Sequence, residues 1–557
     1  MATNPKNLEE KLERQRREAE EADAKRRAEK NSLPYLNLVS TTVPTEIEAM
    51  ALVREDEAKK ALLVPLQLVR KKLSIAVFDP ASEKALAVLK RLGEKYELQI
   101  FIASLAGLKH VWSFYEYVGS QKEIAGRVEI NKENLSRLAE SIKSFAGFAN
   151  QIKSFEGPRT SDLLEIILAG ALALKASDMH LEPAEGRGII RLRVDGVLHD
   201  IEKNFPTNRY KSILNRVKLL SALKINISDE PQDGRFTIEL HNKDVEVRTS
   251  IVPSEYGETT VMRVLDPESL KTNLGDLGLR KDDFQILRAE IEEPNGLILN
   301  TGPTGSGKTT TLYAILKTLS RPEVKIVTIE DPIEYHIEGI SQTQVKPDAS
   351  YTFANGLRSI LRQDPDVILV GEIRDQETAE VALQASLTGH LVLSTLHAND
   401  AAGTIPRLID LGAKPQSIAP GLNLIMAQRL VRLLCSDCKK ETAISAMVRK
   451  KLKEFVANLP KRVSRDGLDS PKLYAGAGCE KCAGLGYKGR TSLFELLRIT
   501  KDVEDMIYKN PNEIDITHLA KQQEMVTMQE DGVIKVMLGE TAFDEVERLT
   551  GKIEWLH

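Results

Sequence analysis

The chain has 557 residues, which at roughly 100–200 residues per domain predicts about three to five domains. Hydrophobic residues make up 42% of it and charged residues 28%, a composition typical of globular protein rather than of a disordered chain. The 77 basic and 81 acidic residues nearly balance, so nothing indicates the basic stripe of a nucleic-acid binder. Apolar runs are strand-sized and the N-terminus is charged, so we expect a cytoplasmic protein without a membrane span or signal peptide.

The N-terminal region divides into three predicted parts. Residues 1–32 form a leader in which acids precede bases by four residues, a spacing that favours a solvated helix; a partner-binding helix is the alternative. Residues 33–119 are a small α/β domain, with predicted strands at 73–78 and 98–102 and a helix at 85–95 between them. Residues 120–157 are polar and predict a linker.

The remaining chain predicts a multidomain α/β fold. A second N-terminal α/β domain spans residues 158–270 and opens with a helix at 161–177. Its Asp195-Gly196 pair between two apolar runs predicts a β-hairpin. After a hinge at 271–284, strands alternate with helices over 285–430, which predicts a parallel sheet covered on both faces. Residues 431–557 hold the cysteines and mainly helical segments.

A phosphate-binding loop lies at the start of this alternating region. It matches the fixed pattern G-x-x-x-x-G-K-[ST] between a predicted strand and a predicted helix. Lys308 is expected to reach the β- and γ-phosphates of ATP, and Thr309 to ligate Mg²⁺. A Gly-rich turn without function is the alternative. The predicted nucleotide-binding residues are Gly302, Pro303, Thr304, Gly305, Ser306, Gly307, Lys308, Thr309 and Thr310.

Two acidic residues end later predicted strands, where ligands of open α/β sheets bind. Glu372 follows an apolar run and is the candidate general base, and Glu330 is expected to support the metal or the water. Helix capping is the alternative for either acid. His390 and His397 flank a third predicted strand, which makes one of them a candidate sensor of the γ-phosphate; a structural histidine is equally compatible.

The four cysteines form two Cys-x-x-Cys pairs, Cys435 with Cys438 and Cys479 with Cys482. Four thiolates in two chelating pairs suit a closed structural Zn²⁺ site. The 40 residues between the pairs exceed the usual spacing, and redox-active or simply buried pairs are the alternative.

Four ordered blocks resemble the secretion ATPase superfamily of type II secretion and type IV pilus motors. Residues 302–309 resemble its Walker A motif, 329–334 its Asp box, 361–375 its Walker B motif and 388–397 its His box. Segments of the second N-terminal domain, such as residues 191–196, resemble the family too. In all, the resemblance covers roughly residues 33–550, and the motifs together are highly specific.

The resemblance implies an ATP-hydrolysing core related to RecA and a homohexamer with ATP at its subunit interfaces. Second-domain arginines would complete the nucleotide site, and the candidates here are Arg235, Arg248 and Arg263. It also implies a tetracysteine zinc module. Such motors act on an inner-membrane platform protein and through it on pilins, so membrane association is expected through partners only, at the inner face of the cytoplasmic membrane.

The resemblance leaves more than one function open. We favour assembly of a type IV pilus, with a type II secretion pseudopilus ATPase as the alternative. A pilus retraction motor is disfavoured, since such motors typically lack the extra N-terminal domain and the tetracysteine module. A RecA-like nucleic-acid-dependent ATPase is a remote alternative that would not share the His box, and we expect no nucleic-acid partner.

Overall fold

The computed structural model describes residues 5–39, 45–120, 127–129, 137, 142, 144–157, 159–240, 243–267, 272–346 and 349–556. The chain forms two compact units, one made of Met1–Val194 with Leu198–Leu265 and the other of Asp195–Val197 with Asp266–His557. Much of the predicted linker, and residue 271 of the predicted hinge, lie outside the described residues. Within the described ranges, no helix is long and apolar enough to cross a membrane.

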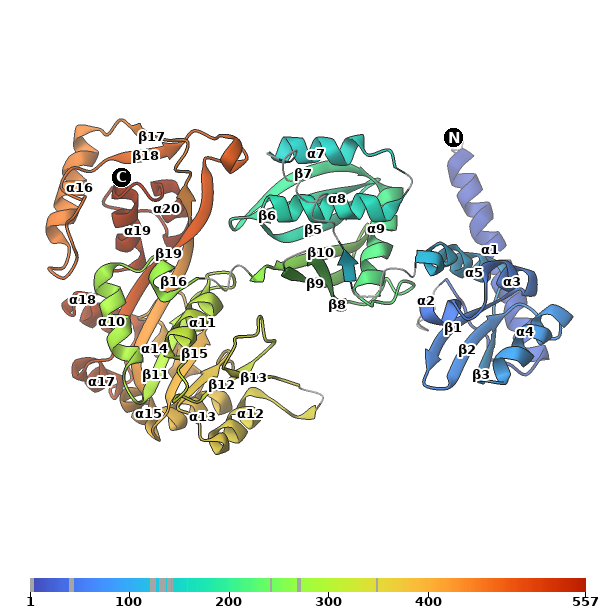
Figure 1. Ribbon diagram of the computed structural model, residues 1–557, viewed down its shortest axis with the longest axis horizontal. Coiled ribbons are helices and arrows are strands. Elements are labelled where there is room, and N and C mark those ends of the chain that lie inside the picture. Colours follow the sequence, from blue (N-terminus) through green and yellow to red (C-terminus); the bar gives the residue numbers. More distant parts are fainter. Residues whose placement is uncertain are drawn as a thin grey trace. The chain divides into compact units, whose positions relative to one another are not determined.

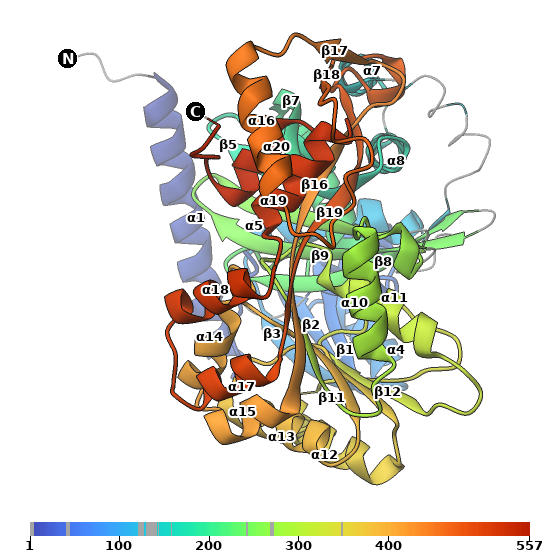
Figure 2. The same cartoon turned by 90° about the vertical axis from the view of Figure 1, so that its left-hand side faces the viewer.

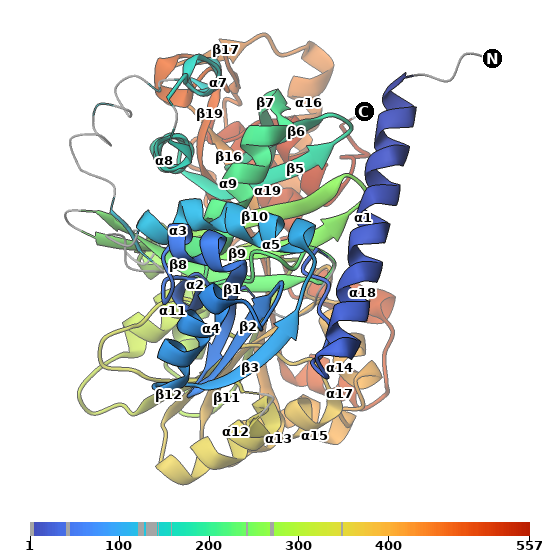
Figure 3. The ribbon, with the colours of Figure 1, turned by 90° about the vertical axis from the view of Figure 1, so that its right-hand side faces the viewer.

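The N-terminal part of the first unit is a three-stranded sheet with helices around it (Figure 3). Strand β2 pairs antiparallel with β1 and parallel with β3. The predicted strands and helix of this domain are confirmed to within a few residues. The elements are α1 (Pro5–Lys30), α2 (Ile47–Met50), α3 (Glu55–Ala61), β1 (Leu63–Val69), β2 (Lys72–Val77), α4 (Glu83–Gly93), β3 (Glu97–Ile102) and α5 (Leu105–Trp112).

The last turns of the leader helix α1 pack on this domain. Ala24 and Ala28 are buried, and the carboxylate of Glu21 accepts hydrogen bonds of 2.6 Å from both Tyr35 and Ser104. Together with a Glu20 carboxylate that accepts from the Ala106 backbone N–H, these contacts join the helix to α5. The expectation of a wholly solvated helix is therefore wrong for this end of α1, because small residues on one side let the helix approach closely.

The rest of the first unit is a seven-stranded sheet in the order β4-β8-β9-β10-β5-β6-β7. The predicted hairpin joins β6 to β7, and its Asp195 and Gly196 both have positive φ, as a type I′ turn requires. Its elements are β4 (Arg127–Glu129), α7 (Phe145–Ser154), α8 (Thr160–Ala173), β5 (Ala176–Ala184), β6 (Arg187–Val194), β7 (Val197–Pro206), α9 (Thr207–Leu220), β8 (Gln232–Leu240), β9 (Lys243–Ser254) and β10 (Gly257–Leu265).

The second unit is built on a seven-stranded sheet in the order β13-β12-β14-β15-β11-β16-β19 (Figure 1). Every neighbouring pair is parallel except β16 and β19. The main elements are α10 (Lys281–Ile291), β11 (Gly296–Thr301), α11 (Lys308–Leu319), β12 (Ile326–Glu330), β13 (Ser341–Gln344), α12 (Phe353–Ile360), β14 (Val367–Val370), α13 (Gln376–Leu387), β15 (Leu391–Leu396), α14 (Thr404–Asp410), α15 (Pro415–Gly421), β16 (Leu422–Leu434) and β19 (Tyr487–Arg498).

Helices cover both faces of this sheet (Figure 2). On the inner strand β11, Leu297 and Leu299 enter one apolar core with α12, α13 and α15, whereas Ile298 enters another core with α10 and α11. This alternation explains why the strand is apolar at every position, since both of its faces are buried. The predicted multidomain α/β fold, with a doubly covered parallel sheet, is confirmed.

The C-terminal region both completes the sheet and adds a separate lobe. Strand β16 runs across the predicted boundary at residues 430 and 431, and β19 of the C-terminal region pairs with it. A third apolar core joins the helices α16, α19 and α20. The remaining elements are β17 (Lys439–Thr442), α16 (Ala446–Asn458), β18 (Leu473–Gly476), α17 (Lys501–Ile507), α18 (Glu513–Gln522), α19 (Met528–Met537) and α20 (Phe543–Thr550).

Candidate functional site

The predicted phosphate-binding loop connects the end of β11 to the start of α11. Gly302 and Gly307 both have positive φ, and a Cβ atom on Gly302 would lie 2.6 Å from the Gln428 carbonyl oxygen. Glycine is therefore required by conformation and by space. Thr309 is exposed in the first turn of α11. The backbone N–H groups at this helix N-terminus form the positive end of a dipole, which suits a phosphate.

Two polar side chains of the loop, those of Lys308 and Ser306, are positioned to bind an anion. The Lys308 ammonium donates to the Gly302 and Pro303 carbonyl oxygens, at 2.7 and 3.0 Å. Burial lowers the pKa of Lys308, while the nearby Glu372 carboxylate acts in the opposite direction. The buried Ser306 hydroxyl has no hydrogen-bond partner among the described residues. Both observations fit a loop built for polyphosphate.

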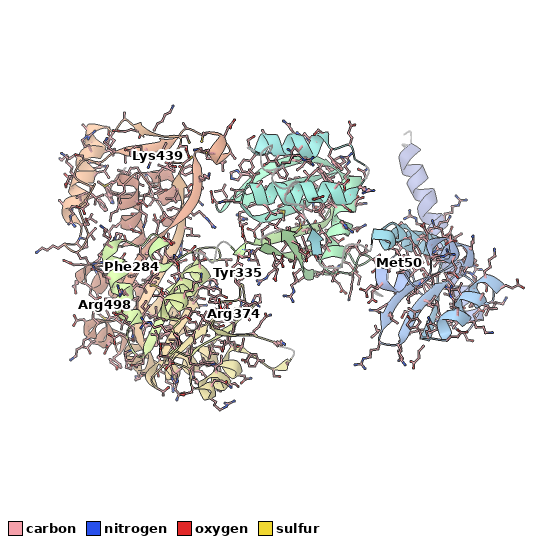
Figure 4. The ribbon with its side chains drawn as sticks, in the orientation of Figure 1. Met50, Phe284, Tyr335, Arg374, Lys439 and Arg498 are labelled. Atoms are coloured by element: carbon pink, nitrogen blue, oxygen red, sulfur yellow. The ribbon has the colours of Figure 1, made fainter. Side chains whose placement is uncertain are left out.

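Glu372 lies just past the C-terminal end of β14, at the centre of an ion-pair cluster. Its carboxylate pairs with Arg374 and lies 3.6 Å from Nε2 of His397. Arg374, labelled in Figure 4, also pairs with Asp331 at 3.4 Å. The hydrogen bond to Glu372 raises the pKa of Arg374, so this guanidinium stays charged beside both acids. Sequence reasoning did not select Arg374 or Asp331, although both stand in the motif blocks.

Glu330 has a different environment. Its side chain is buried at the end of β12, and its carboxylate accepts hydrogen bonds from Tyr313, from Thr328 and, at 3.1 Å, from Gln342. Burial and this carboxylate raise the pKa of Tyr313, so the phenol remains a donor. The structure thus places Glu330 at the expected sheet edge, with its oxygens already bonded to protein donors.

The two histidines lie at opposite ends of strand β15. His397 follows β15 and faces Glu372 on the edge that carries the phosphate loop, whereas His390 precedes β15 and contacts the Ala385 carbonyl oxygen at 3.0 Å. At about 3.3 Å per residue, the two are roughly 20 Å apart. Of the two histidines, only His397 lies beside Glu372. Its position directly after the end of a strand is the sequence signal that could have distinguished it from His390.

A buried amide couples the phosphate loop to the C-terminal region. The Gln428 side-chain oxygen accepts hydrogen bonds from Asn300 at 3.0 Å and from Thr311 at 2.9 Å, and its nitrogen donates to Ser492 at 3.0 Å. Asn300 precedes the loop, Thr311 belongs to α11, and Ser492 belongs to β19. Gln428 was missed by sequence reasoning because nothing local marks a buried glutamine.

The predicted second-domain arginines lie on adjacent strands of the first unit. Arg235 is on β8, Arg248 on β9 and Arg263 on β10, and the structure pairs Arg235 with Arg248 and Arg248 with Arg263 across the strands. The three are therefore brought together on one face of the sheet. The phosphate loop belongs to the second unit.

The four cysteines gather as the sequence predicts, despite the long gap between the pairs. Their sulfur atoms all lie within 4.8 Å of one another, with Cys435–Cys479 and Cys438–Cys482 both at 3.8 Å. Sulfurs bound tetrahedrally at about 2.3 Å from one zinc ion lie roughly 3.8 Å apart, so this spacing fits a metal. Backbone N–H groups of Cys479 and Gly486 donate to the Cys482 sulfur, each at 3.2 Å, as they would to a thiolate.

Comparisons with known proteins identify the family of this chain. A family model described as "Type II/IV secretion system protein" matches residues 156–548, and a model of the MshEN domain matches residues 31–110. The chain is 42% identical to type II secretion system protein E of Dickeya dadantii over 444 residues, or 77% of this chain and 85% of that protein. It is 36% identical to the type IV pilus assembly ATPase PilB of Myxococcus xanthus over 521 residues, or 92% and 88%.

A solved structure has the same fold. The Legionella pneumophila ATPase DotB aligns with a TM-score of 0.51 at 22% identity and covers 71% of this chain and 97% of its own. The phosphate loop, the Glu372 cluster and the matching family model together lead to one conclusion: the chain belongs to the type II/IV secretion system protein family and is a secretion ATPase, similar to both the type II secretion and the type IV pilus assembly proteins.

Proposed function

We propose that this ATPase is a hexameric motor that powers assembly of a type IV pilus through an inner-membrane platform protein. The observation that carries the proposal is the likeness to the Myxococcus pilus assembly ATPase, which extends over 92% of this chain, against 77% for the Dickeya secretion protein. The motor would work at the cytoplasmic face of the inner membrane, held there by its partners.

The geometry supports a division of labour among the residues of the second unit. ATP would bind on Gly302–Thr309, where the Lys308 ammonium exchanges loop carbonyls for phosphate oxygens. Thr309 would hold Mg²⁺, which offsets the phosphate charge when bound. Glu372 would orient and deprotonate the attacking water, and His397, 3.6 Å away, would sense the γ-phosphate. The Glu330 carboxylate is already hydrogen-bonded to three protein donors. We therefore assign it a supporting role at the metal or the water, beside its chain neighbour Asp331.

The arginines give the reason for a ring. Arg235, Arg248 and Arg263 belong to the first unit and the phosphate loop to the second. In a hexamer with ATP at its subunit interfaces, these arginines would complete the nucleotide site, and a guanidinium would offset charge on the transferring phosphoryl group. Hydrolysis would then change the angle between the second N-terminal domain and the ATPase core, about the predicted hinge at residues 271–284.

The tetracysteine cluster would hold structural zinc. Its four sulfurs, all within 4.8 Å of one another, would fill a tetrahedral coordination sphere and leave no position for a substrate or water. The metal would join the segment after β16 to the segment before β19, the antiparallel pair that ends the sheet.

Cys435→Ser is expected to abolish zinc binding and to lower the thermal midpoint by about 5 °C or more, because three ligands bind zinc far more weakly than four. Zinc per subunit, by elemental mass spectrometry, and thermal unfolding measure both effects. The neighbouring exposed Ser436→Ala is the control and keeps both values. A Cys435→Ser protein with an unchanged zinc content would refute the metal assignment.

A type II secretion pseudopilus motor is the second candidate, and the 42% identity to the Dickeya protein favours it. A chromosomal Lys308→Ala allele in the source organism distinguishes the two. We expect surface pili to disappear from electron micrographs while exported enzyme activity in the culture medium stays unchanged. Loss of exported activity with normal pili would overturn the pilus assignment in favour of secretion.

A further inference from the structure

The backbone around His397 is anchored to a neighbouring strand of the second unit. The His397 side chain is 53% exposed, so the chain around it must supply most of its orientation. The Thr301 hydroxyl at the end of β11 accepts a hydrogen bond from the Ala398 N–H and donates one to the Leu396 carbonyl oxygen, both at 2.9 Å. The backbone on either side of His397 is therefore tied to the residue that precedes the phosphate loop.

Residues 399–401 continue from this point and are held by two further strands. The first contact comes from Arg429 on β16, whose Nη2 donates to the Asn399 carbonyl oxygen at 2.7 Å. Nη1 of the same side chain donates to the Gln428 carbonyl oxygen at 3.2 Å. It also lies 3.1 Å from the point that a Cβ atom on Gly302 would occupy, so the guanidinium packs against the first residue of the phosphate loop.

The second contact comes from Glu495 on β19, whose side chain is only 5% exposed. Its Oε1 accepts a hydrogen bond from the Ala401 N–H at 2.9 Å, and its Oε2 accepts one from the Met528 N–H at 3.2 Å. Met528 is the first residue of helix α19. A single carboxylate therefore joins the segment after His397 to a helix of the C-terminal region.

A carboxylate is a costly side chain to bury at this place. Burial raises the pKa of Glu495 to about 7, and the nearby carboxylates of Asp400 and Glu530 act in the same direction, whereas the two N–H donors oppose the rise. Among the described residues its hydrogen-bond donors are backbone N–H groups, without the basic partner that usually accompanies a buried acid. A glutamine would avoid the charge but could accept only one of the two bonds, because its amide nitrogen is a donor. The need for two acceptors explains the acid.

We propose that Arg429 and Glu495 are positioning residues for ATP hydrolysis: they fix residues 398–401 and thereby hold the His397 imidazole beside Glu372. The inference rests on the proposed role of His397 as the sensor of the γ-phosphate. It adds two residues that lie outside the motif blocks 302–309, 329–334, 361–375 and 388–397. Both act through backbone carbonyl and N–H groups and touch no reacting atom.

Glu495→Gln is the first test, because the amide keeps the size of the side chain but places a donor opposite one of the two N–H groups. We expect kcat for ATP hydrolysis to fall by about tenfold, since a misplacement of about 1 Å at a reacting site costs up to about 100-fold in rate. KM for ATP stays within about twofold, because the phosphate loop supplies most of the binding. The control is Glu290→Gln, which changes another buried acid that contacts β19, through Arg498, and keeps both constants.

Arg429→Ala is the second test and removes the contact with the Asn399 carbonyl oxygen from the other side of the segment. We expect a loss of kcat of similar size, again with little change in KM. Its control is Arg407→Ala, which removes an exposed arginine of the neighbouring helix α14 and is expected to keep wild-type turnover. Wild-type kcat in either Glu495→Gln or Arg429→Ala would overturn the proposal.

A comparison in a His397→Ala background separates positioning from a merely structural role. In that background, Glu495→Gln and Arg429→Ala are each expected to lower kcat no further, because both act through the histidine. A further loss there would overturn the proposal and would show that the two residues serve the fold or the phosphate loop directly.

Failure of this inference and failure of the sensor role give different results. If His397→Ala lowers kcat while Glu495→Gln and Arg429→Ala keep it, the sensor role stands and the present inference is wrong. If His397→Ala itself keeps wild-type kcat, the sensor role in the proposed function fails, and the inference that rests on it fails as well.

Discussion

Lys308→Ala is expected to reduce ATP hydrolysis to background, by about 10³-fold or more, because it removes the only charge that the loop itself would bring to the β- and γ-phosphates. The ammonium is positioned before nucleotide arrives, through hydrogen bonds to the Gly302 and Pro303 carbonyls. Its burial makes the charge unfavourable until an anion compensates it, as the lowered pKa indicates. Phosphate release in a coupled assay measures the effect.

The matched control is Lys317→Ala, which removes a lysine from the last turn of the same helix α11. It is expected to retain wild-type turnover and to show that loss of one positive charge on α11 is not enough to stop the enzyme. Normal turnover in Lys308→Ala would mean that the loop does not bind the reacting phosphates, and the ATPase site would have to lie elsewhere.

Glu372→Gln is expected to lower kcat by about 10²–10³-fold while ATP still binds, because an amide cannot take a proton from water. The carboxylate lies at the end of β14, and its partners Arg374 and His397 hold it on the edge that carries the phosphate loop. Stopped-flow hydrolysis and binding of a fluorescent ATP analogue report the two quantities separately.

Glu377→Gln is the matched control for this acid, since Glu377 is an exposed residue in the first turn of α13 that pairs with Arg358. Its kcat is expected to match the wild type. Rapid hydrolysis by Glu372→Gln would show that another acid activates the water, and Asp331, which shares Arg374 with Glu372, would become the first candidate.

The parts of the fold and site that the sequence predicted are those with local causes. The loop at residues 302–309 needs glycines, a lysine and a helix start in a fixed order, so the sequence pattern alone is enough to predict the conformation of the loop. The hairpin at Asp195-Gly196 follows from backbone conformation in the same way. The two Cys-x-x-Cys pairs point to one metal site because a thiolate pair alone leaves a tetrahedral ion half coordinated.

The parts that were missed depend on contacts between distant segments. Gln428 bonds to residues 117 and 128 positions away in the chain, and no local pattern marks it. Glu330 itself was predicted, but its environment, which Tyr313 and Gln342 set, was not. Arg374, which joins two acids from different strands, was missed for the same reason as Gln428. The packing of α1 on its domain was missed because the helix is highly charged. The residues Ala24 and Ala28, which it buries, are too small to form a recognisable apolar stripe.

The three predicted arginines of the first unit show why strand register matters. Arg235, Arg248 and Arg263 were selected by resemblance, but their arrangement in one row depends on two strand pairings that spacing alone does not fix.

The most direct test of a site shared between subunits mixes two inactive variants, Lys308→Ala with its arginines intact and Arg263→Ala with its phosphate loop intact. ATPase activity of the reassembled mixture is measured against each variant alone. We expect activity to return, because some interfaces combine an intact loop with an intact arginine from the neighbour. A mixture no more active than the sum of its parts, under conditions where labelled subunits exchange, would contradict it.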